Sequence, residues 1–208
     1  LSLNISRETL QSDKHVLAIA KGLETKIHNE LKDMLTNDFE SYKKFFEAFG
    51  SQIKYGIYNM YGMNKDKLKD LLVFYSKDKG DLITLDEYVK NMKEGQENIY
   101  YASGESVSKI DSLPQVEQIK KKGFDILYLT NYLDEFVISV LREEDGKTFK
   151  SVSDSSLDLY TEEEKEANKK LNEDNKDMLA EIKDALGDEV TSVRFTNKLD
   201  SHPVCLTS

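Results

Sequence analysis

The sequence predicts a mixed α/β (α+β) protein: a helical segment, then a small layered α/β unit with parallel strands, then a long helix and the start of a second α+β unit. Two observations predict this order. Up to about residue 92, apolar side chains recur every three or four positions, the period of an amphipathic helix. Between residues 98 and 130, two apolar stretches rich in strand formers flank a helical stretch, the pattern of a β-α-β unit.

Two long helices are expected first. Apolar spacing over residues 16–35 predicts a helix of about six turns that begins at Ser12 or Asp13. A second helix is expected after Asp38, because the aromatic residues that follow lie on one side of a helix: Phe39, Tyr42, Phe45, Phe46 and Phe49. Gly50 is expected to end it, since glycine readily takes the left-handed conformation of a helix terminus.

Two shorter helices are expected next. One is indicated by the spacing of four residues: Leu68, Leu71, Leu72 and Tyr75. The other begins at Thr84, which forms a capping-box pair with Glu87 ahead of three further apolar residues, Leu85, Tyr88 and Met92. The first half of the chain is therefore predicted to be mostly helical.

The β-α-β unit is expected over residues 98–130. Residues 98–102 (NIYYA) and 124–130 (FDILYLT) have the composition of buried strands. Between them, Ser112 and Pro114 are typical of a helix start, and Gly123 marks its end. Because a helical crossover of this length joins parallel strands in a right-handed sense, we expect the two strands to be parallel.

The unit is expected to continue with a helix over residues 131–142 and a strand over residues 147–152. The Ser/Asp-rich segment 151–158 then has the composition of a linker. The charge balance also changes here, because residues 1–150 carry 22 basic and 25 acidic side chains and the remainder carries 7 and 14. These features place a domain boundary near residues 151–160.

Beyond the linker, Thr161 and Glu164 form another capping box, and an apolar stripe predicts one long acidic helix that stops at Gly187. Residues 189–196 alternate imperfectly between apolar and polar side chains and predict a strand, with a final short strand near residues 204–206. This second sheet would be incomplete within the sequence, which suggests that the sequence is a piece of a longer protein.

Composition argues against several classes of function. The formal charge of −10 disfavours nucleic-acid binding, and the apolar stretches are too short for a membrane-spanning helix. The three histidines are far apart and do not have the spacing of a metal site, so no metal is expected. The single thiol, Cys205, and the absence of a leader-like segment favour a cytoplasmic protein.

Nor does the sequence contain a glycine-rich phosphate-binding loop or a nucleophile-and-base constellation. Arginine is scarce beside lysine, since only Arg7, Arg142 and Arg194 occur. The planar guanidinium group has five donors, so an arginine that is retained in such a chain can have a specific role. Arg7 precedes the first long helix, where a loop could project its head group.

Four long stretches give the sequence a specific resemblance: LSLNISRETLQ at 1–11, YVKNMKEGQENIYYASGES at 88–106, KKGFDILYLTNYLDEF at 121–136 and DGKTFKSVS at 145–153. They resemble consecutive stretches of the ninety-kilodalton heat-shock protein (heat shock protein 90) chaperones, in the same order and with the same separations. The resemblance implies that residues 1–152 are the C-terminal part of the middle domain and residues 153–208 the first part of the C-terminal domain. The lysine-rich composition favours a bacterial member.

The resemblance implies roles for five residues. In this family an arginine at the position matched by Arg7, accompanied by a glutamine matched by Gln11, reaches the terminal phosphate of ATP held by the N-terminal domain. Pro is usual where this sequence has Ser2, which weakens the expected stiffness of the loop. A helix matched by residues 132–142 contacts client proteins, and there Glu135, Phe136 and Ser139 share a face.

The resemblance also implies the cofactors and partners. ATP and magnesium would belong to the intact protein, while this segment would hold no cofactor and hydrolyse nothing alone. The expected partners are unfolded or partly folded clients, the protein's own N-terminal domain and, in the intact protein, a second copy of itself. Two alternatives stay open: a passive protein-interaction module without nucleotide coupling, and a small α/β enzyme with a site at the carboxyl ends of strands 98–102 and 124–129.

Overall fold

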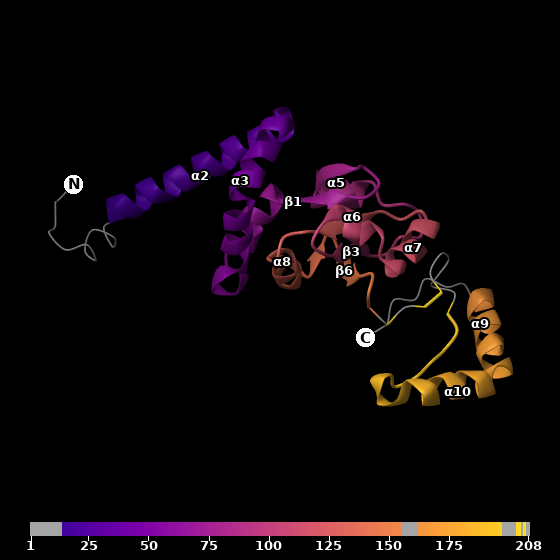
Figure 1. The fold of residues 1–208 in the computed structure, drawn as a ribbon. Coiled ribbons are helices and arrows are strands. Elements are labelled where there is room, and N and C mark those ends of the chain that lie inside the picture. The colour runs from indigo at the N-terminus through magenta and orange to yellow at the C-terminus, as the bar shows by residue number, and fades with distance from the viewer. Residues whose placement is uncertain (1–13, 155–161, 197–202, 205, 207–208) are drawn as a thin grey trace.

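The computed structural model describes residues 14–154, 162–196, 203, 204 and 206 (Figure 1). Along the chain its first elements are α2 (Lys14–Asn37), α3 (Phe39–Tyr58), η1 (Asn59–Gly62), α4 (Lys65–Leu68), η2 (Lys69–Leu71), β1 (Val73–Ser76), β2 (Asp81–Thr84), α5 (Leu85–Lys90) and β3 (Ile99–Ser103). They are followed by α6 (Val107–Asp111), α7 (Pro114–Lys121), β4 (Ile126–Leu129), α8 (Asp134–Leu141), β5 (Glu143–Glu144), β6 (Lys147–Ser151), α9 (Glu162–Asp174), α10 (Lys176–Leu186) and η3 (Gly187–Glu189). The mixed α/β (α+β) class is confirmed.

The six strands form one mixed sheet in the order β2-β1-β4-β3-β6-β5. The predicted β-α-β unit is confirmed, because β3 and β4 are parallel, with Tyr100 opposite Ile126, and helices α6 and α7 lie between them in the chain. The predicted third strand also forms, as β6, and pairs in parallel with the other side of β3. The antiparallel pairs are β1 with β2, β1 with β4 and β5 with β6.

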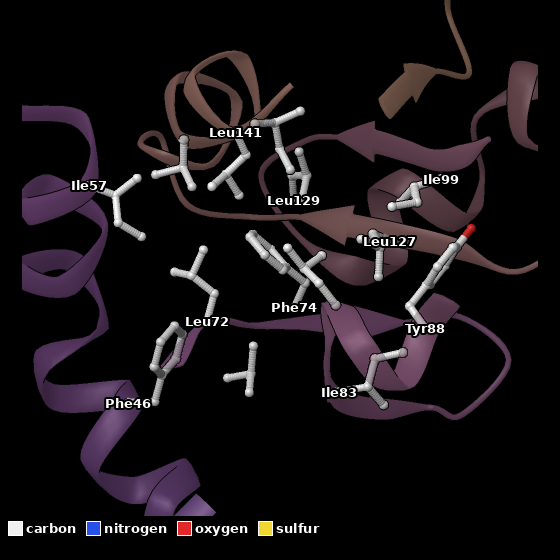
Figure 2. Packing of buried hydrophobic residues seen from close by; sticks show 14 of the residues in the cluster. Phe46, Ile57, Leu72, Phe74, Ile83, Tyr88, Ile99, Leu127, Leu129 and Leu141 are labelled. Atoms are coloured by element: carbon white, nitrogen blue, oxygen red, sulfur yellow. The ribbon is translucent and has the colours of Figure 1, made fainter. Parts of the chain in front are cut away.

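Both faces of the sheet are covered by helices, so the central strand β4 is buried along its whole length. Leu127 and Leu129 point into a core that includes side chains of α3, α5 and α8 (Figure 2). Ile126 and Tyr128 point the opposite way, into a second core formed with α6 and α7. The alternation follows from the two-residue period of a strand, and it explains why the apolar run ILYL shows no polar alternation.

Helix α2 is confirmed, although only its C-terminal end uses the predicted apolar stripe. Leu31, Met34 and Leu35 pack against the first core. Leu23 and Ile27, nearer the start of the helix, are exposed among the described residues. The proposed starting residues, Ser12 and Asp13, lie outside the described residues.

The prediction that Gly50 ends the second helix is wrong. Asp38 caps the start of α3, where its side chain accepts a hydrogen bond from the backbone N–H of Ser41, but the helix continues through Gly50 to Tyr58. Gly50 is needed for packing: a Cβ atom there would lie 2.9 Å from the ring of Phe46. The residue is a glycine because a buried ring approaches it closely, and not because the helix ends there.

We therefore expect Gly50→Ala to destabilise the protein, by about 1–3 kcal/mol, because the added methyl group overpacks the space beside Phe46. Gly22 is a matched control on α2, since a Cβ atom there would meet nothing within 4 Å. Gly22→Ala is expected to be neutral or stabilising, by up to about 1 kcal/mol, through helix propensity. Urea unfolding of the two variants measures the difference, and equal free energies of unfolding would contradict this account of Gly50.

The prediction of a helix through Tyr75 is also wrong. The helical stretch ends with η2 at Leu71, and residues 73–76 form β1, which makes an antiparallel hairpin with β2. The four residues between the strands end with Gly80 at φ +68°, a conformation that favours glycine. Val73, Phe74 and Ser76 are buried, and β1 pairs on its other side with β4. Pairing with a strand that lies fifty residues further along the chain decides this element.

The start of α5 is as predicted, because the Thr84 side chain accepts a hydrogen bond from the N–H of Glu87. The single long helix predicted after the linker is wrong. Two helices, α9 and α10, meet at Asn175, which has φ −115° and donates from its side chain to the Leu171 carbonyl. Asparagine favours such local bonds over helix continuation. Gly187 ends α10 as predicted, at φ +62°, while Thr161 lies outside the described residues.

The predicted strand over residues 189–196 does not form in the described residues. The backbone of Phe195 is bonded to a side chain instead of to a strand: Phe195 N donates to Asn172 Oδ1 at 2.8 Å, and Asn172 Nδ2 donates to the Phe195 carbonyl. Without a neighbouring strand, an alternating pattern cannot make a ladder. Of the predicted final strand over residues 204–206, the described residues 204 and 206 are also not in a strand, and residue 205 lies outside them.

Candidate functional site

Helix α8, which carries the three expected client-binding residues, is held by the turn that precedes it. Asn131 organises this turn: its side-chain oxygen accepts a hydrogen bond from Leu133 N, and its amide group donates to Ser51 Oγ on α3 at 3.0 Å. Asp134, the first residue of α8, accepts from Asn131 N through Oδ2. The turn therefore fixes the start of α8 and fastens it to α3.

A buried ion pair lies beside this turn. Lys54 Nζ on α3 lies 2.6 Å from Asp134 Oδ1, and the two residues are only 6% and 2% exposed. The ammonium group also lies over the rings of Phe46 and Phe74, at 5.2 and 5.5 Å from their centroids. Cation–π contacts of this kind partly compensate a cation for lost hydration.

Glu135, Phe136 and Ser139 share a face of α8, as the sequence predicted, and this face is exposed. Phe136 is 48% exposed, and its ring lies against that of Tyr58 at the end of α3, with 5.3 Å between the centroids. Glu135 accepts a hydrogen bond from Ser103 Oγ at 2.7 Å, and Ser139 Oγ donates to the Phe136 carbonyl. Phe136 is therefore not a buried core residue, since about half of it faces solvent.

Elements next to α8 also expose large apolar side chains, namely Tyr58, Tyr61, Met63 and Tyr132. Tyr61 has φ +55°, unusual for a residue with a Cβ atom, and is followed by Gly62 at φ +81°. A Cβ atom on Gly62 would lie 2.5 Å from Val140 Cγ1, so only glycine allows η1 to approach the end of α8 this closely. The backbone turn thus presents Tyr61 to solvent while its neighbour packs on α8.

A cleft of about 380 Å³ lies between α3 and the sheet, and Lys54 and Asp134 are among its lining residues. Its other charged residues are of both signs, and Lys43 is already paired with Glu40 and Asp81. The side-chain hydrogen bonds from these two acids raise the pKa of Lys43 above its ordinary value. The cleft therefore offers no surplus of one charge to select a ligand.

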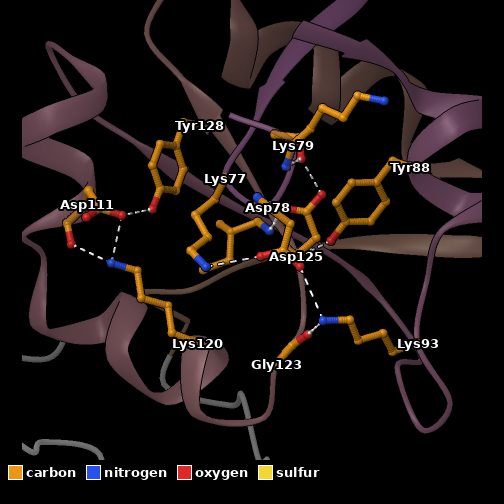
Figure 3. Close-up of polar contacts among 12 residues, drawn as sticks. Lys77, Asp78, Lys79, Tyr88, Lys93, Asp111, Lys120, Gly123, Asp125 and Tyr128 are labelled. Atoms are coloured by element: carbon orange, nitrogen blue, oxygen red, sulfur yellow. Dashed lines mark hydrogen bonds and ion pairs between the residues drawn. The ribbon is translucent and has the colours of Figure 1, made fainter. Parts of the chain in front are cut away.

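A network of polar contacts lies at the amino-terminal ends of β3 and β4 (Figure 3). The carboxylate of Asp125 accepts from Ser76 Oγ and from Asp78 N, which ties the β1–β2 turn to the start of β4. The Tyr88 hydroxyl donates to the Asp125 carbonyl and accepts from Gln96 Nε2 and from Tyr100 N. Burial raises the pKa of Tyr88, so the hydroxyl stays protonated as this bonding requires.

Several charged side chains in this network form ion pairs, whereas the Asp125 carboxylate accepts from a hydroxyl and from backbone N–H groups. Burial alone would raise the pKa of Asp78, but hydrogen bonds from Lys77 and Lys93 lower it below its ordinary value. Lys120, in the last turn of α7, lies 2.7 Å from Asp111 and offsets the helix dipole. Mutual hydrogen bonding and pairing of this kind is typical of a structural network, and the pattern does not provide an activated nucleophile.

The carboxyl ends of β3 and β4, where an α/β enzyme would have its site, are occupied by α8 and its turn. Ser103 ends β3 and is bonded to Glu135, while Asn131 follows β4 and is bonded to Ser51. Within the described residues, no three His, Cys, Asp or Glu side chains come close enough to hold a metal ion. No helix in the described ranges is both long and apolar enough to cross a membrane.

The sequence places Glu135, Phe136 and Ser139 on one face of α8 but gives no sign of the residues that support this helix. Tyr58 and Lys54 belong to the aromatic-rich helix α3, and only their distances to α8 show that they belong to the same site. The period of α3 could have placed Lys54 on the buried side, because it lies four residues after Gly50 and three before Ile57, which are both buried. Arg7 and Gln11, the other expected site residues, lie outside the described residues.

Comparison with known proteins covers the whole chain. A family model described as "Hsp90 protein" matches residues 1–208. The chain is 50% identical over 208 residues to a protein of Clostridium perfringens named "Chaperone protein HtpG", and 47% identical to the protein of that name in Bacillus subtilis. Both matches cover the full length of this chain, which corresponds to only 33% of the length of each relative. On this evidence, with a fold of the expected class, the chain belongs to the Hsp90 protein family.

Proposed function

We propose that this chain is the part of an ATP-dependent molecular chaperone that holds client proteins and transmits the nucleotide state to them. Residues 1–152 would be the C-terminal part of the middle domain and residues 153–208 the first part of the C-terminal domain. Family membership over the full chain supports the chaperone role, as do relatives that are named chaperones. The relatives are bacterial, which agrees with a bacterial member of the family.

One observation carries the client-binding part of the proposal: Phe136 is half exposed although it lies on a helix whose other side is core. An aromatic ring that faces solvent is unfavourable for the free protein, yet it gives a large apolar contact at a low entropic cost when a partner covers it. Glu135 and Ser139 are exposed on the same face of α8 and add polar groups to it. The class of ligand that fits is an unfolded or partly folded polypeptide with exposed apolar side chains.

The nucleotide part of the proposal concerns Arg7 and Gln11 and derives from the family resemblance. ATP and magnesium would be bound by the N-terminal domain of the full-length protein, and Arg7 would reach the terminal phosphate from the middle domain. A guanidinium group suits this task because its planar array of donors matches phosphate oxygens. The chain studied by itself is expected to hydrolyse nothing, and the full-length protein is expected to act as a homodimer.

Phe136→Ala is expected to weaken client binding by about tenfold, equivalent to about 1.4 kcal/mol, because it removes an aromatic anchor. The free energy of unfolding should change by less than about 1 kcal/mol, since the ring is only half buried. Binding is measured by fluorescence anisotropy of a labelled, permanently unfolded polypeptide, made by reducing and carboxymethylating a small disulfide-bonded protein. Thermal melts of the same samples report stability.

Phe49 supplies the matched control. It is 53% exposed and stacks on Phe45 of the same helix, about 13 Å along α3 from Tyr58. Phe49→Ala therefore removes an aromatic ring of similar exposure away from the Tyr58–Phe136 contact and should leave the affinity unchanged. Equal losses in both variants would indicate unspecific apolar binding, and a steep drop in the melting temperature of Phe136→Ala alone would indicate a packing residue.

A further inference from the structure

The ion pair between Lys54 and Asp134 differs from the other ion pairs among the described residues in its burial. Both side chains are almost fully buried. Among the described residues, the carboxylate that pairs with Lys54 Nζ is that of Asp134. A buried pair of this kind is not a strong source of stability, because the loss of hydration offsets most of the attraction. The pair can instead define how α3 and α8 are oriented, since the two charges come together in only one arrangement of these helices.

The two elements that it joins are those that make up the proposed client surface. Lys54 is one helical turn before Tyr58 on α3, and Asp134 is two residues before Phe136 on α8. Because the Tyr58 and Phe136 rings are in contact, with 5.3 Å between their centroids, the arrangement of α3 and α8 decides how much of the Phe136 ring faces solvent. The ion pair holds the start of α8, and the close contact of Gly62 with Val140 holds its end.

We propose that the Lys54–Asp134 ion pair is a positioning element for client binding: it sets the orientation of α8 on α3 and thereby presents Phe136 to a client polypeptide. The inference rests on the proposed client-binding function. According to this proposal, two buried residues affect client affinity although neither of them contacts the client. Without the pair, the apolar contacts of Val137, Ile138 and Leu141 would still attach α8 to the core, but in a less defined orientation.

The test separates orientation from stability. Lys54→Met combined with Asp134→Leu replaces the pair by apolar side chains of similar size, a change that is often neutral or stabilising in a buried site. The chain contains no tryptophan, so Phe136→Trp introduces a single fluorophore at the surface in question. Acrylamide quenching of the F136W chain reports the exposure of the indole, and it is measured with and without the paired substitution.

We expect K54M/D134L to be within about 1–2 kcal/mol of the unmodified chain in stability, the difference coming from the lost acceptor of the Asn131 N–H. Quenching of the F136W reporter should rise, because the ring separates from Tyr58. Affinity for the carboxymethylated polypeptide, measured with Phe136 in place, should fall about threefold or more. K54Q/D134N, which keeps the shapes and hydrogen-bonding groups without charge, provides a second variant that should show the same direction if the apolar pair does not fold.

A matched control breaks an exposed pair. Lys90 and Asp86 are about 70% exposed and lie on α5, so Lys90→Met should change neither quenching nor affinity. Unchanged quenching in both paired variants would overturn the proposal, and so would a rise in quenching without a loss of affinity. If Phe136→Ala itself leaves client affinity unchanged, the proposed function fails, whereas a failure confined to the paired variants removes only the positioning role.

Discussion

Replacing Arg7 by alanine in the full-length protein is expected to lower kcat for ATP hydrolysis by about 10³-fold or more while nucleotide affinity changes little. The reason lies in where the guanidinium group would act. Adenine and ribose would be held by the N-terminal domain, so Arg7 would meet only the terminal phosphate. An arginine that stabilises charge on a transferring phosphoryl group is worth about 10³ to 10⁵ in rate.

Single-turnover hydrolysis, with nucleotide binding measured on the same samples, tests this expectation. Arg7→Lys should restore little activity, because an ammonium group supplies charge without the planar pair of donors. Gln11→Ala should have a milder effect, equivalent to one neutral hydrogen bond of about 0.5–1.5 kcal/mol. Turnover at the normal rate in Arg7→Ala would favour the alternative of a passive interaction module without nucleotide coupling.

Asp134→Leu as a single substitution is expected to destabilise the protein by about 3–5 kcal/mol, the second largest effect. The change leaves the Lys54 ammonium buried without its counter-charge and removes the acceptor of the Asn131 N–H. An uncompensated buried charge is much more unfavourable than the loss of the pair as a whole. Urea unfolding of the 208-residue chain gives the free energy directly.

The single and paired substitutions complete a double-mutant cycle. Lys54→Met alone should also be destabilising, because Asp134 then lacks its cation, and the paired variant should lie within about 1–2 kcal/mol of the unmodified chain. An additive cycle, in which the paired variant is as unstable as the sum of the single ones, would show that Lys54 and Asp134 do not interact strongly. Lys90→Met again serves as the control, with an effect of less than about 1 kcal/mol.

Part of the candidate site could be predicted from the sequence. The resemblance pointed to Glu135, Phe136 and Ser139, and the helical period put them on one side of α8. That this side faces solvent depends on the position of Tyr58 and on the core beneath α8, neither of which has a signal near residue 136. The Lys54–Asp134 pair joins residues eighty positions apart, so no local pattern predicts it.

Local interactions determined the elements that the sequence by itself predicts correctly. The start of α5 depends on a bond between Thr84 and Glu87, and the end of α10 on Gly187. The parallel pairing of β3 and β4 follows from the length and helical character of the connection between them. Each of these features is decided by residues close together in the chain, whose conformations are restricted in the same way in any fold.

The tertiary structure alone decided the rest. Residues 73–76 form a strand because β4 offers hydrogen-bonding partners, whereas residues 189–196 form none because a ladder needs a neighbour that the described residues do not supply. Residue 62 is a glycine because Val140 Cγ1, on the distant helix α8, would lie 2.5 Å from a Cβ atom there. The physical reason is the same in each case: strand pairing, close packing and buried charge are interactions between distant segments, which the order of residues specifies only through the complete fold.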